Sequence, residues 1–527
     1  MNQQELERLI ILEKRIKELA QEFGLSIVEI DFELVSPQRM MEGIAYRLPV
    51  NFSHWSRGRD YERYKTVFDF TGGGLAYEIV WNFKHPRALL MNTNPLILNV
   101  LTIAHVYGHV DFNLRNIFTS QGREIADMAL EAKHAIKRFE EYEKQYGKEQ
   151  VEKVVEAGFS LEWLQDPNPL AQEMDEEVLR ERLLEILRAK LKKAKGSDSE
   201  LIKKASDNEI RRLQTAIKKL KHRTPPEPTY DILGYIIRHS SKIQKNEWQY
   251  DVLSVIRDQA RSFARQMRTK LLNEGWATHW HAKIMNRLFE ENLLDSKEHE
   301  IYTKYHTAVL RESRSSINWY LTGTNLFQYI KERWDKGQFG KDWEEEKNSN
   351  IRSHWDTGAM LGNEKIFKVS QNFTDRMAIE EFFTNDFIHH EKLYIYAEMT
   401  SPLFPDEIVY VIAEDNPEVI RRILVDQHTN YGSPLITVED GNYGNKGELY
   451  LKHQFSGFEL DPIRENGALE YIYLIWGKPV HFETIEIEES SVPFKQMKAK
   501  RILHSYDGKE HRMAYIDNRS GNPKHPQ

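Results

Sequence analysis

Two histidines, His105 and His109, stand four residues apart in a stretch that is otherwise mostly apolar. If this stretch is a helix, both imidazoles lie on one face, one turn apart, and can reach a single metal ion. The zinc-protease pattern has a glutamate directly after the first histidine, which acts as the general base. Val106 holds that position here, so a hydrolytic site needs a base from elsewhere in the chain. The alternative is a pair of core histidines satisfied by side-chain hydrogen bonds, which the spacing alone favours.

A second group of polar residues follows much later, around Glu274 and His281. These two are seven residues apart, about two helical turns, so they share a face from which His279 points away. With the first pair they would supply three histidines and one carboxylate. If one ligand exchanges for water, such a set suits zinc or another divalent ion, and Glu274 could instead be the base. The sequence therefore predicts a metal site of His105, His109, His281 and Glu274.

The second group also has an interpretation without metal. Trp276 and Trp280 would anchor the core, and Glu274 would pair with Lys270, four residues earlier. Taken alone, this group favours that interpretation, and only its combination with the histidine pair supports a metal. The combination requires that the long stretch between His109 and Glu274 folds back.

Three further residues are candidates for orienting the ligands or for moving a proton. Glu78 lies in a predicted buried strand, where a carboxylate needs a cation or a catalytic task. Asp111 follows the histidine pair, and His54 lies in an aromatic loop, where it could equally be a packed loop residue. We therefore expect Glu274, Glu78, Asp111 and His54 to be the catalytic residues.

The composition excludes several kinds of protein. The chain has 527 residues, 40% hydrophobic and 29% charged, as expected of a folded protein with about two to four domains. Cysteine is absent, so any metal must be held by His, Asp or Glu. The net charge of -8 excludes a protein that is basic over its whole surface and coats nucleic acid. No stretch is apolar enough to span a membrane and the first residues lack a secretory signal, so we expect a cytoplasmic protein.

The periodicity of apolar residues predicts an α+β protein. We expect a mainly helical N-terminal and central region with a small mixed sheet, and a smaller C-terminal α+β domain. The histidine pair falls on a helix predicted from Pro95 to about Phe112. Composition shifts predict five consecutive regions: 1–132 with the histidine pair, 133–229 as a charged helical insertion with a Pro-rich linker, 230–345 as a helical region with the second group, 364–490 as the C-terminal α+β domain, and 491–527 as a polar tail.

The charged insertion carries a basic cluster between Lys203 and Arg223. A solvated helical face is the favoured interpretation, although the cluster could hold an acidic partner. It lacks interleaved aromatic residues, so we expect no nucleic acid to bind there.

Taken in order, these segments resemble the stage V sporulation protein R (SpoVR) family over most of Leu6 to Glu483. The matching motifs are Pro49 through His54-Trp55-Ser56, Tyr77-Glu78, His105-x-x-x-His109-x-Asp111-Phe112, Trp248-Gln249-x-Asp251, Asn273-Glu274-Gly275-Trp276-Ala277-x-x-Trp280-His281, Ile317-Asn318-x-Tyr320, Asp440-Gly441-Asn442-Tyr443, Gly447 through His453, and Trp476 through His481. Each motif is modest, whereas their ordered combination is highly specific. The chain departs from the family pattern at Arg57-Gly58-Arg59, after Phe112 and at His279, none of which is a predicted ligand.

The resemblance implies a link to spore cortex formation, and hence to peptidoglycan, and to stress physiology in relatives that do not sporulate. With the predicted site, it suggests a zinc-dependent hydrolase acting on a cell-wall peptide or precursor, because water bound to zinc can have a pKa of about 7. The alternative is a non-catalytic regulatory or binding protein with a structural metal or none, whose C-terminal domain binds a protein partner. An iron redox site is a third option.

Overall fold

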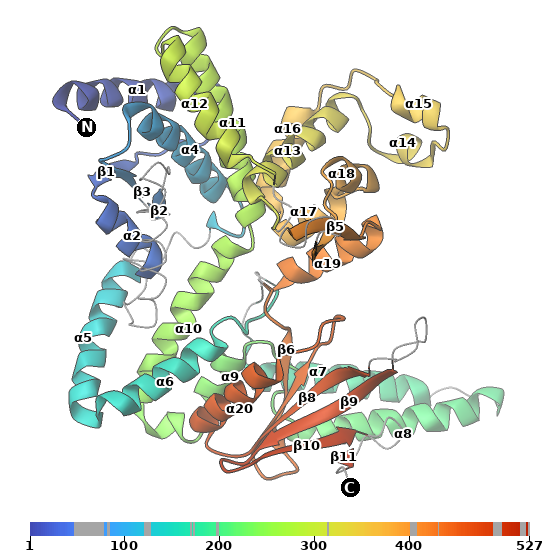
Figure 1. Cartoon of the computed structure of the whole chain (residues 1–527). Helices are drawn as coiled ribbons and strands as arrows, with labels where there is room; N and C mark the ends of the chain where they lie inside the picture. The colour runs from blue at the N-terminus through green and yellow to red at the C-terminus, as the bar shows by residue number, and fades with distance from the viewer. Residues whose placement is uncertain are drawn as a thin grey trace. The chain divides into compact units, whose positions relative to one another are not determined.

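The chain folds into two compact units, each assembled from two separate segments. Unit one comprises Met1–Lys137 and Ser262–Tyr431, and unit two comprises Arg138–Arg261 and Gly432–Gln527. The computed structural model (Figure 1) describes residues 1–46, 78–81, 85–120, 128–168, 171, 174–195, 200–312, 316–400, 408–430, 432–488, 498–516 and 523–524. Helices dominate and the strands form small sheets, which confirms the predicted α+β class. Because the units interleave along the chain, the predicted region 230–345 is divided between them, which composition along the chain cannot indicate.

Unit one is a layer of helices beside a three-stranded sheet with the order β1-β3-β2. Its strands are β1 (Asp31–Val35), β2 (Ile79–Trp81), β3 (Arg87–Met91), β4 (Ile395–Thr400) and β5 (Ile408–Glu414), of which the last two form a separate hairpin. Its helices are α1 (Gln3–Glu22), α2 (Pro37–Tyr46), α4 (Leu96–Arg115), α11 (Lys270–Glu290), α12 (Ser296–Val309), α13 (Trp319–Asp335), α14 (Lys341–Glu345), α15 (Ser349–Ser353), α16 (Gly362–Asn372), α17 (Asp375–Phe382), α18 (Asn385–His390) and α19 (Pro417–Thr429). The bounds of α5 (Met128–Tyr146) and α10 (Glu247–Met267) include residues of both units.

Helix α4 is the centre of unit one. Every residue from Ile97 to Asn113 is buried, because the helix is apolar around almost its whole circumference and α1, α11, α12 and α16 pack around it. Helix α11 approaches it closely: a Cβ on Gly108 would lie 2.6 Å from the Cα of Ala277. These glycine and alanine positions bring the two helical backbones together.

Two buried acidic side chains, Asp375 and Asp111, accept hydrogen bonds from α11 and hold it in position. Asp375 accepts hydrogen bonds from the free backbone N–H groups of Leu271 (2.8 Å) and Leu272 (3.0 Å) in the first turn of the helix. Burial raises the pKa of Asp375 to about 8, although both bonds favour its ionised form. Asp111 of α4 accepts from the indole N–H of Trp276 at 2.8 Å. Together these bonds set the position and rotation of the turn that follows Asn273.

Unit two is built on a six-stranded sheet with the order β11-β10-β9-β8-β7-β6. Its strands are β6 (Ile436–Tyr443), β7 (Glu448–His453), β8 (Val480–Glu488), β9 (Lys498–Tyr506), β10 (His511–Ile516) and β11 (Pro523–Lys524), and its helices are α6 (Lys148–Leu161), α7 (Glu176–Lys195), α8 (Glu200–His222), α9 (Ile232–His239), the short 3-10 helix η3 (Ile243–Lys245) and α20 (Pro462–Trp476). Strands β7 and β8 are parallel, and α20 connects them and packs against β8 and β9 (Figure 1).

The region 491–527, predicted as a polar tail, contains three strands of the six-stranded sheet, β9, β10 and β11. Strand β9 pairs with the whole length of β8, and β10 pairs with β9. Composition did not indicate these strands because they bury few side chains, among them Ile502 and Leu503. They are stabilised mainly by strand pairing, which begins with β8. No helix in the described part of the chain is long and apolar enough to cross a membrane.

The contact between α11 and α13 gives a test of this packing. Gly275 faces Gly323, and a Cβ on Gly275 would lie 2.3 Å from the Gly323 carbonyl carbon. We expect Gly275→Ala to force the helices apart and to lower the free energy of unfolding by about 1–3 kcal/mol, measured by urea denaturation. The matched control is Gly467→Ala on α20, where a Cβ meets nothing within 4 Å and should stabilise by about 0.5–1 kcal/mol. Equal stabilities of the two variants would contradict the packing described.

Candidate metal centre

Four side chains of unit one converge on one point. Both histidines of the pair come from α4, Glu274 comes from α11, and Glu78 immediately precedes β2. One ligand atom from each of Glu78, His105, His109 and Glu274 lies within 4.8 Å of the others. The predicted fold-back between His109 and Glu274 is therefore present.

The spacing of these atoms fits a small divalent ion. The Nε2 atoms of His105 and His109 each lie 3.2 Å from Oε1 of Glu78 and 3.5 Å from Oε2 of Glu274. A tetrahedral ion with bonds of about 2.1 Å separates its ligand atoms by about 3.4 Å. The four imidazole–carboxylate separations thus match those around a four-coordinate ion, and the remaining two are at most 4.8 Å.

The bonding state of Glu274 also favours a cation. Its Oε2 atom is buried and has no hydrogen-bond partner. Burial opposes ionisation, but His109 and His105 outweigh it and hold the pKa of Glu274 below its ordinary value. The close partners of Oε2 are the two imidazoles at 3.5 Å, and a divalent ion between these groups would satisfy the buried oxygen directly. The residues present therefore fit such an ion.

The outer nitrogens of the histidine pair are held by neighbours. His109 Nδ1 lies 2.9 Å from the amide oxygen of Asn273. Because that oxygen only accepts, Nδ1 carries the proton and Nε2 faces the cluster. His105 Nδ1 lies 2.8 Å from Nδ1 of His281, whose Nε2 in turn lies 2.9 Å from Nδ1 of His306. If Nε2 of His105 binds a cation, each imidazole in this row donates one proton to the next.

The predicted ligand His281 lies behind His105, and Glu78 stands where His281 was expected. The reason is geometric: His109 lies opposite Asn273 and His105 opposite His281, so α4 and α11 are antiparallel. Seven residues along a helix span about 10 Å, too far for Glu274 and His281 to meet at one ion. The structure thus brings together three of the four predicted ligands, and places His281 where it can orient His105. Burial and the neighbouring imidazoles lower the pKa of His281 well below its ordinary value, so it is neutral.

The other predicted catalytic residues have different places. Asp111 is fully buried and accepts hydrogen bonds from the backbone N–H of Ser26 (2.6 Å), from Arg115 (2.9 Å) and from Trp276. It holds α4 to its neighbours and acts on the cluster only through the position of α11. His54 lies outside the described residues.

Tyr320 is a residue of the site that its sequence context does not reveal. Its ring centre lies 6.1 Å from that of His105. The negative charge of Glu274, and then burial, raise the pKa of Tyr320 well above its ordinary value, so the hydroxyl keeps its proton. Its motif, Ile317-Asn318-x-Tyr320, matches the sporulation family, but the spacing of these residues predicts no chemistry. Only the packing of α13 against α11 brings this tyrosine to the cluster.

Comparison with known proteins places the chain in a family. The family model described as SpoVR like protein matches residues 3–433. The chain belongs to this family. The resemblance inferred from the motifs is thereby confirmed, and strands β6 to β10 lie beyond the matched residues.

The SpoVR-like chain also resembles a curated protein of Escherichia coli (strain K12). The two are 26% identical over 493 residues, which covers 89% of this chain and 90% of the other. That relative is named uncharacterized protein YcgB, so its name states no activity. No solved structure matches the chain.

Substitution of the histidines tests the ligand set. We expect protein purified without an affinity tag to contain one divalent ion per chain, and His105→Ala and His109→Ala to lose it, as measured by elemental analysis. His281→Ala should keep the stoichiometry at saturating metal with about 10- to 100-fold lower affinity, because it removes only the support of a ligand. His390→Ala is the control, since the His390 side chain is 82% exposed. Complete metal loss in His281→Ala would make His281 a ligand, and unchanged metal in the two α4 variants would remove the site.

Binding of the ion should release a proton. Burial lowers the pKa of His109, but the charges of Glu274 and Glu78 outweigh it and raise the pKa to about 9 in the metal-free protein. A metal ion must displace this proton, so affinity should increase about tenfold per pH unit from pH 6 to 8 and level off near pH 9. Titration with Zn²⁺ in two buffers of different ionisation enthalpy measures both the affinity and the released proton. An affinity independent of pH over this range would contradict the assignment of His109.

Proposed function

We propose that this SpoVR-like protein is a metal-dependent hydrolase whose centre is the cluster of Glu78, His105, His109 and Glu274. The observation that carries the proposal is the presence of two glutamates beside two histidines. Hydrolytic zinc sites bind the metal through three protein side chains, often two histidines and a glutamate, and leave the fourth position open. Here the second glutamate is then available as the base that the first motif lacks.

The chain's own residues have distinct tasks in this proposal. His105, His109 and Glu78 hold the ion, which supplies Lewis-acid chemistry by polarising a carbonyl and acidifying water. Glu274, whose Oε2 atom makes no hydrogen bond, would take the proton of the attacking water. Tyr320 keeps its hydroxyl proton beside Glu274 and can donate a hydrogen bond to developing negative charge.

The ligand types limit the choice of metal, and the family suggests the substrate. Imidazole and carboxylate ligands without a thiolate suit zinc, and also suit iron. The family's link to the spore cortex makes an amide bond in a cell-wall peptide or precursor the proposed target, in the cytoplasm. Elemental analysis identifies the metal, and optical spectra after anaerobic loading with iron test the redox alternative.

A structural metal is the second candidate. Four protein side chains whose ligand atoms lie within 4.8 Å of one another can close the coordination sphere, which is typical of structural sites. In that case the protein is a regulatory or binding protein, and the ion ties α4 to α11 and to the start of β2.

Glu274→Gln separates the two candidates. For a hydrolase with Glu274 as base, we expect the variant to retain the ion and the melting temperature, and to lower kcat on muropeptide substrates by about 10²- to 10⁴-fold. Amine release after incubation with a panel of muropeptides measures turnover, and Asp386→Asn, an exposed acid on α18, is the matched control. Metal-loaded protein that shows no turnover on the panel, yet loses stability on chelation, would favour the structural candidate.

A further inference from the structure

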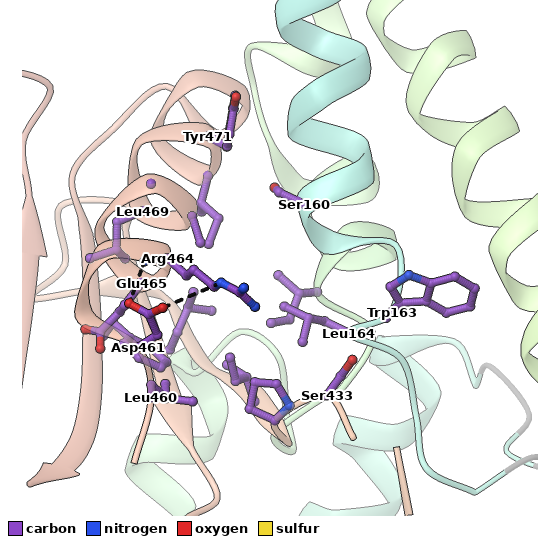
Figure 2. A pocket seen from close by; sticks show the side chains of 18 of the residues that line it. Ser160, Trp163, Leu164, Ser433, Leu460, Asp461, Arg464, Glu465, Leu469 and Tyr471 are labelled. Atoms are coloured by element: carbon purple, nitrogen blue, oxygen red, sulfur yellow. Dashed lines mark hydrogen bonds and ion pairs between the residues drawn. The ribbon is translucent and has the colours of Figure 1, made fainter. Parts of the chain in front are cut away.

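The six-stranded sheet of unit two carries a second group of reactive side chains, independent of the function proposed for the metal centre. One face of this sheet is turned toward α20: Phe482 of β8 lines a cavity of about 660 Å³ between α20 and α6 (Figure 2), and His504 of β9 lies 3.5 Å from Glu465 of α20. Successive side chains of a strand point to opposite faces. His481 and Ser505, which precede and follow these two residues and pair across β8 and β9, therefore share the face that points away from α20.

Glu448, His481 and Ser505 form a continuous row of hydrogen bonds across three strands. His481 Nε2 lies 2.8 Å from Oε2 of Glu448, the first residue of β7, and His481 Nδ1 lies 2.8 Å from Oγ of Ser505. Because a carboxylate oxygen only accepts, Nε2 of the neutral imidazole carries the proton, and Nδ1 accepts the hydrogen bond of the serine hydroxyl. This is the order of nucleophile, base and orienting acid that activates a serine.

Neighbouring residues order this row and leave it within reach of a ligand. Trp476 donates its indole N–H to the backbone carbonyl directly before Glu448, at 3.0 Å, and so fixes the turn that precedes β7. The ring of Tyr443 packs against that of His481, with centres 4.9 Å apart. The side chains of His481 and Glu448 are 16% and 18% exposed, and Ser505 is also partly exposed. A dissolved substrate can therefore approach all three side chains.

A positive charge lies on the other side of the nucleophile. Arg512 of β10 is the cross-strand partner of Ser505, opposite the strand that carries His481. Asp507 holds its guanidinium at 3.0 Å, and the side chain is 59% exposed. A cation beside a nucleophile favours the negative charge that develops when a hydroxyl attacks a carbonyl group.

A second serine–histidine pair in the chain shows what the acid adds. Ser353 Oγ lies 3.0 Å from Nδ1 of His354 in unit one. That Nδ1 also lies 2.9 Å from the backbone oxygen of Asn350, which only accepts, so Nδ1 carries the proton. It cannot take a proton from Ser353, whose hydroxyl donates to the same oxygen at 3.0 Å. At His481 the carboxylate reverses this arrangement and makes the nitrogen that faces the serine a base.

We propose that Ser505, His481 and Glu448 form a triad that hydrolyses esters, with Ser505 as nucleophile, His481 as base and Glu448 as the positioning residue. Ser505 Oγ bonds to the carbonyl carbon as its proton passes to Nδ1 of His481. The bond from that carbon to the alcohol oxygen breaks, and the alcohol leaves with this proton. Water then attacks the acyl group on Ser505 and gives a proton to His481, which returns it to Ser505 as the carboxylic acid departs. Esters are the substrate class because an alcohol departs more readily than an amine.

A fluorophosphonate probe tests the proposal on the full chain, because an activated serine attacks its phosphorus and displaces fluoride. We expect mass spectrometry to find the label on Ser505 and not on Ser353. His481→Gln should lower the labelling rate by about 10²- to 10⁴-fold. With EDTA present to suppress the metal centre, Ser505→Ala should abolish the label and lower kcat for p-nitrophenyl acetate at least tenfold.

Glu448→Gln tests the positioning role. The glutamine amide can donate to Nε2 of His481, which moves the imidazole proton to Nδ1 and removes the base. We expect the maximal labelling rate to fall by about 10²- to 10⁴-fold with an unchanged probe concentration for half-maximal rate, a split that a loss of packing would not give. The matched control is Glu470→Gln, which removes an acid that pairs with His511 at 3.0 Å on the same unit and should leave labelling unchanged.

Thermal unfolding of each variant checks that the fold is retained. No label on Ser505 in the folded protein, equal labelling of Ser505 and Ser353, or an unchanged labelling rate in His481→Gln or Glu448→Gln would each overturn the proposal. So would ester hydrolysis that is unaffected by Ser505→Ala.

Discussion

The close contact of α4 with α11 is the constraint on which the candidate centre depends. Gly108 has no side chain, so the Ala277 backbone can approach it to a distance that any Cβ would prevent. On α11, His281 and Asn273 lie one turn to either side of Ala277, and they contact His105 and His109 of α4. The site is therefore assembled by helix packing, and its geometry is as rigid as the core around it.

The antiparallel direction of these helices explains which of the predicted ligands lie together and which does not. The four-residue spacing of His105 and His109 specifies one face of one helix, which holds whatever α4 packs against. The seven-residue spacing of Glu274 and His281 also places both on one face of a helix. Residues on one face still differ in height along the helix, so the spacing does not determine which of them reaches the histidine pair. Only the register between α4 and α11, set by small residues at their contact, decides that Glu274 joins the pair and that His281 supports it.

Glu78 was predicted to orient ligands or to move a proton, but nothing in the sequence indicated that it or Tyr320 would reach this cluster. Glu78 reaches the cluster from the start of a three-residue strand, and no periodicity relates a strand end to a distant helix. Tyr320 arrives because α13 packs on α11 through Gly275 and Gly323. Helix α4 itself was predictable from the apolar run after Pro95, because a helix depends on local pattern. The pairing of β9 with β8 depends on distant residues, so a polar composition concealed it.

Two buried glutamates show that burial leads to different charge states when the neighbouring groups differ. At Glu274, two imidazoles face the carboxylate, and their charge holds its pKa down despite burial. A site that keeps a carboxylate ionised beside imidazole nitrogens suits a metal ion, which binds both ligand types. At Glu465 the neighbouring imidazole is neutral, burial alone acts and the pKa rises to about 7. Four ligand atoms from four side chains lie close together at Glu274, whereas Glu465 has a single imidazole nitrogen beside it, so only the first position suits a metal ion.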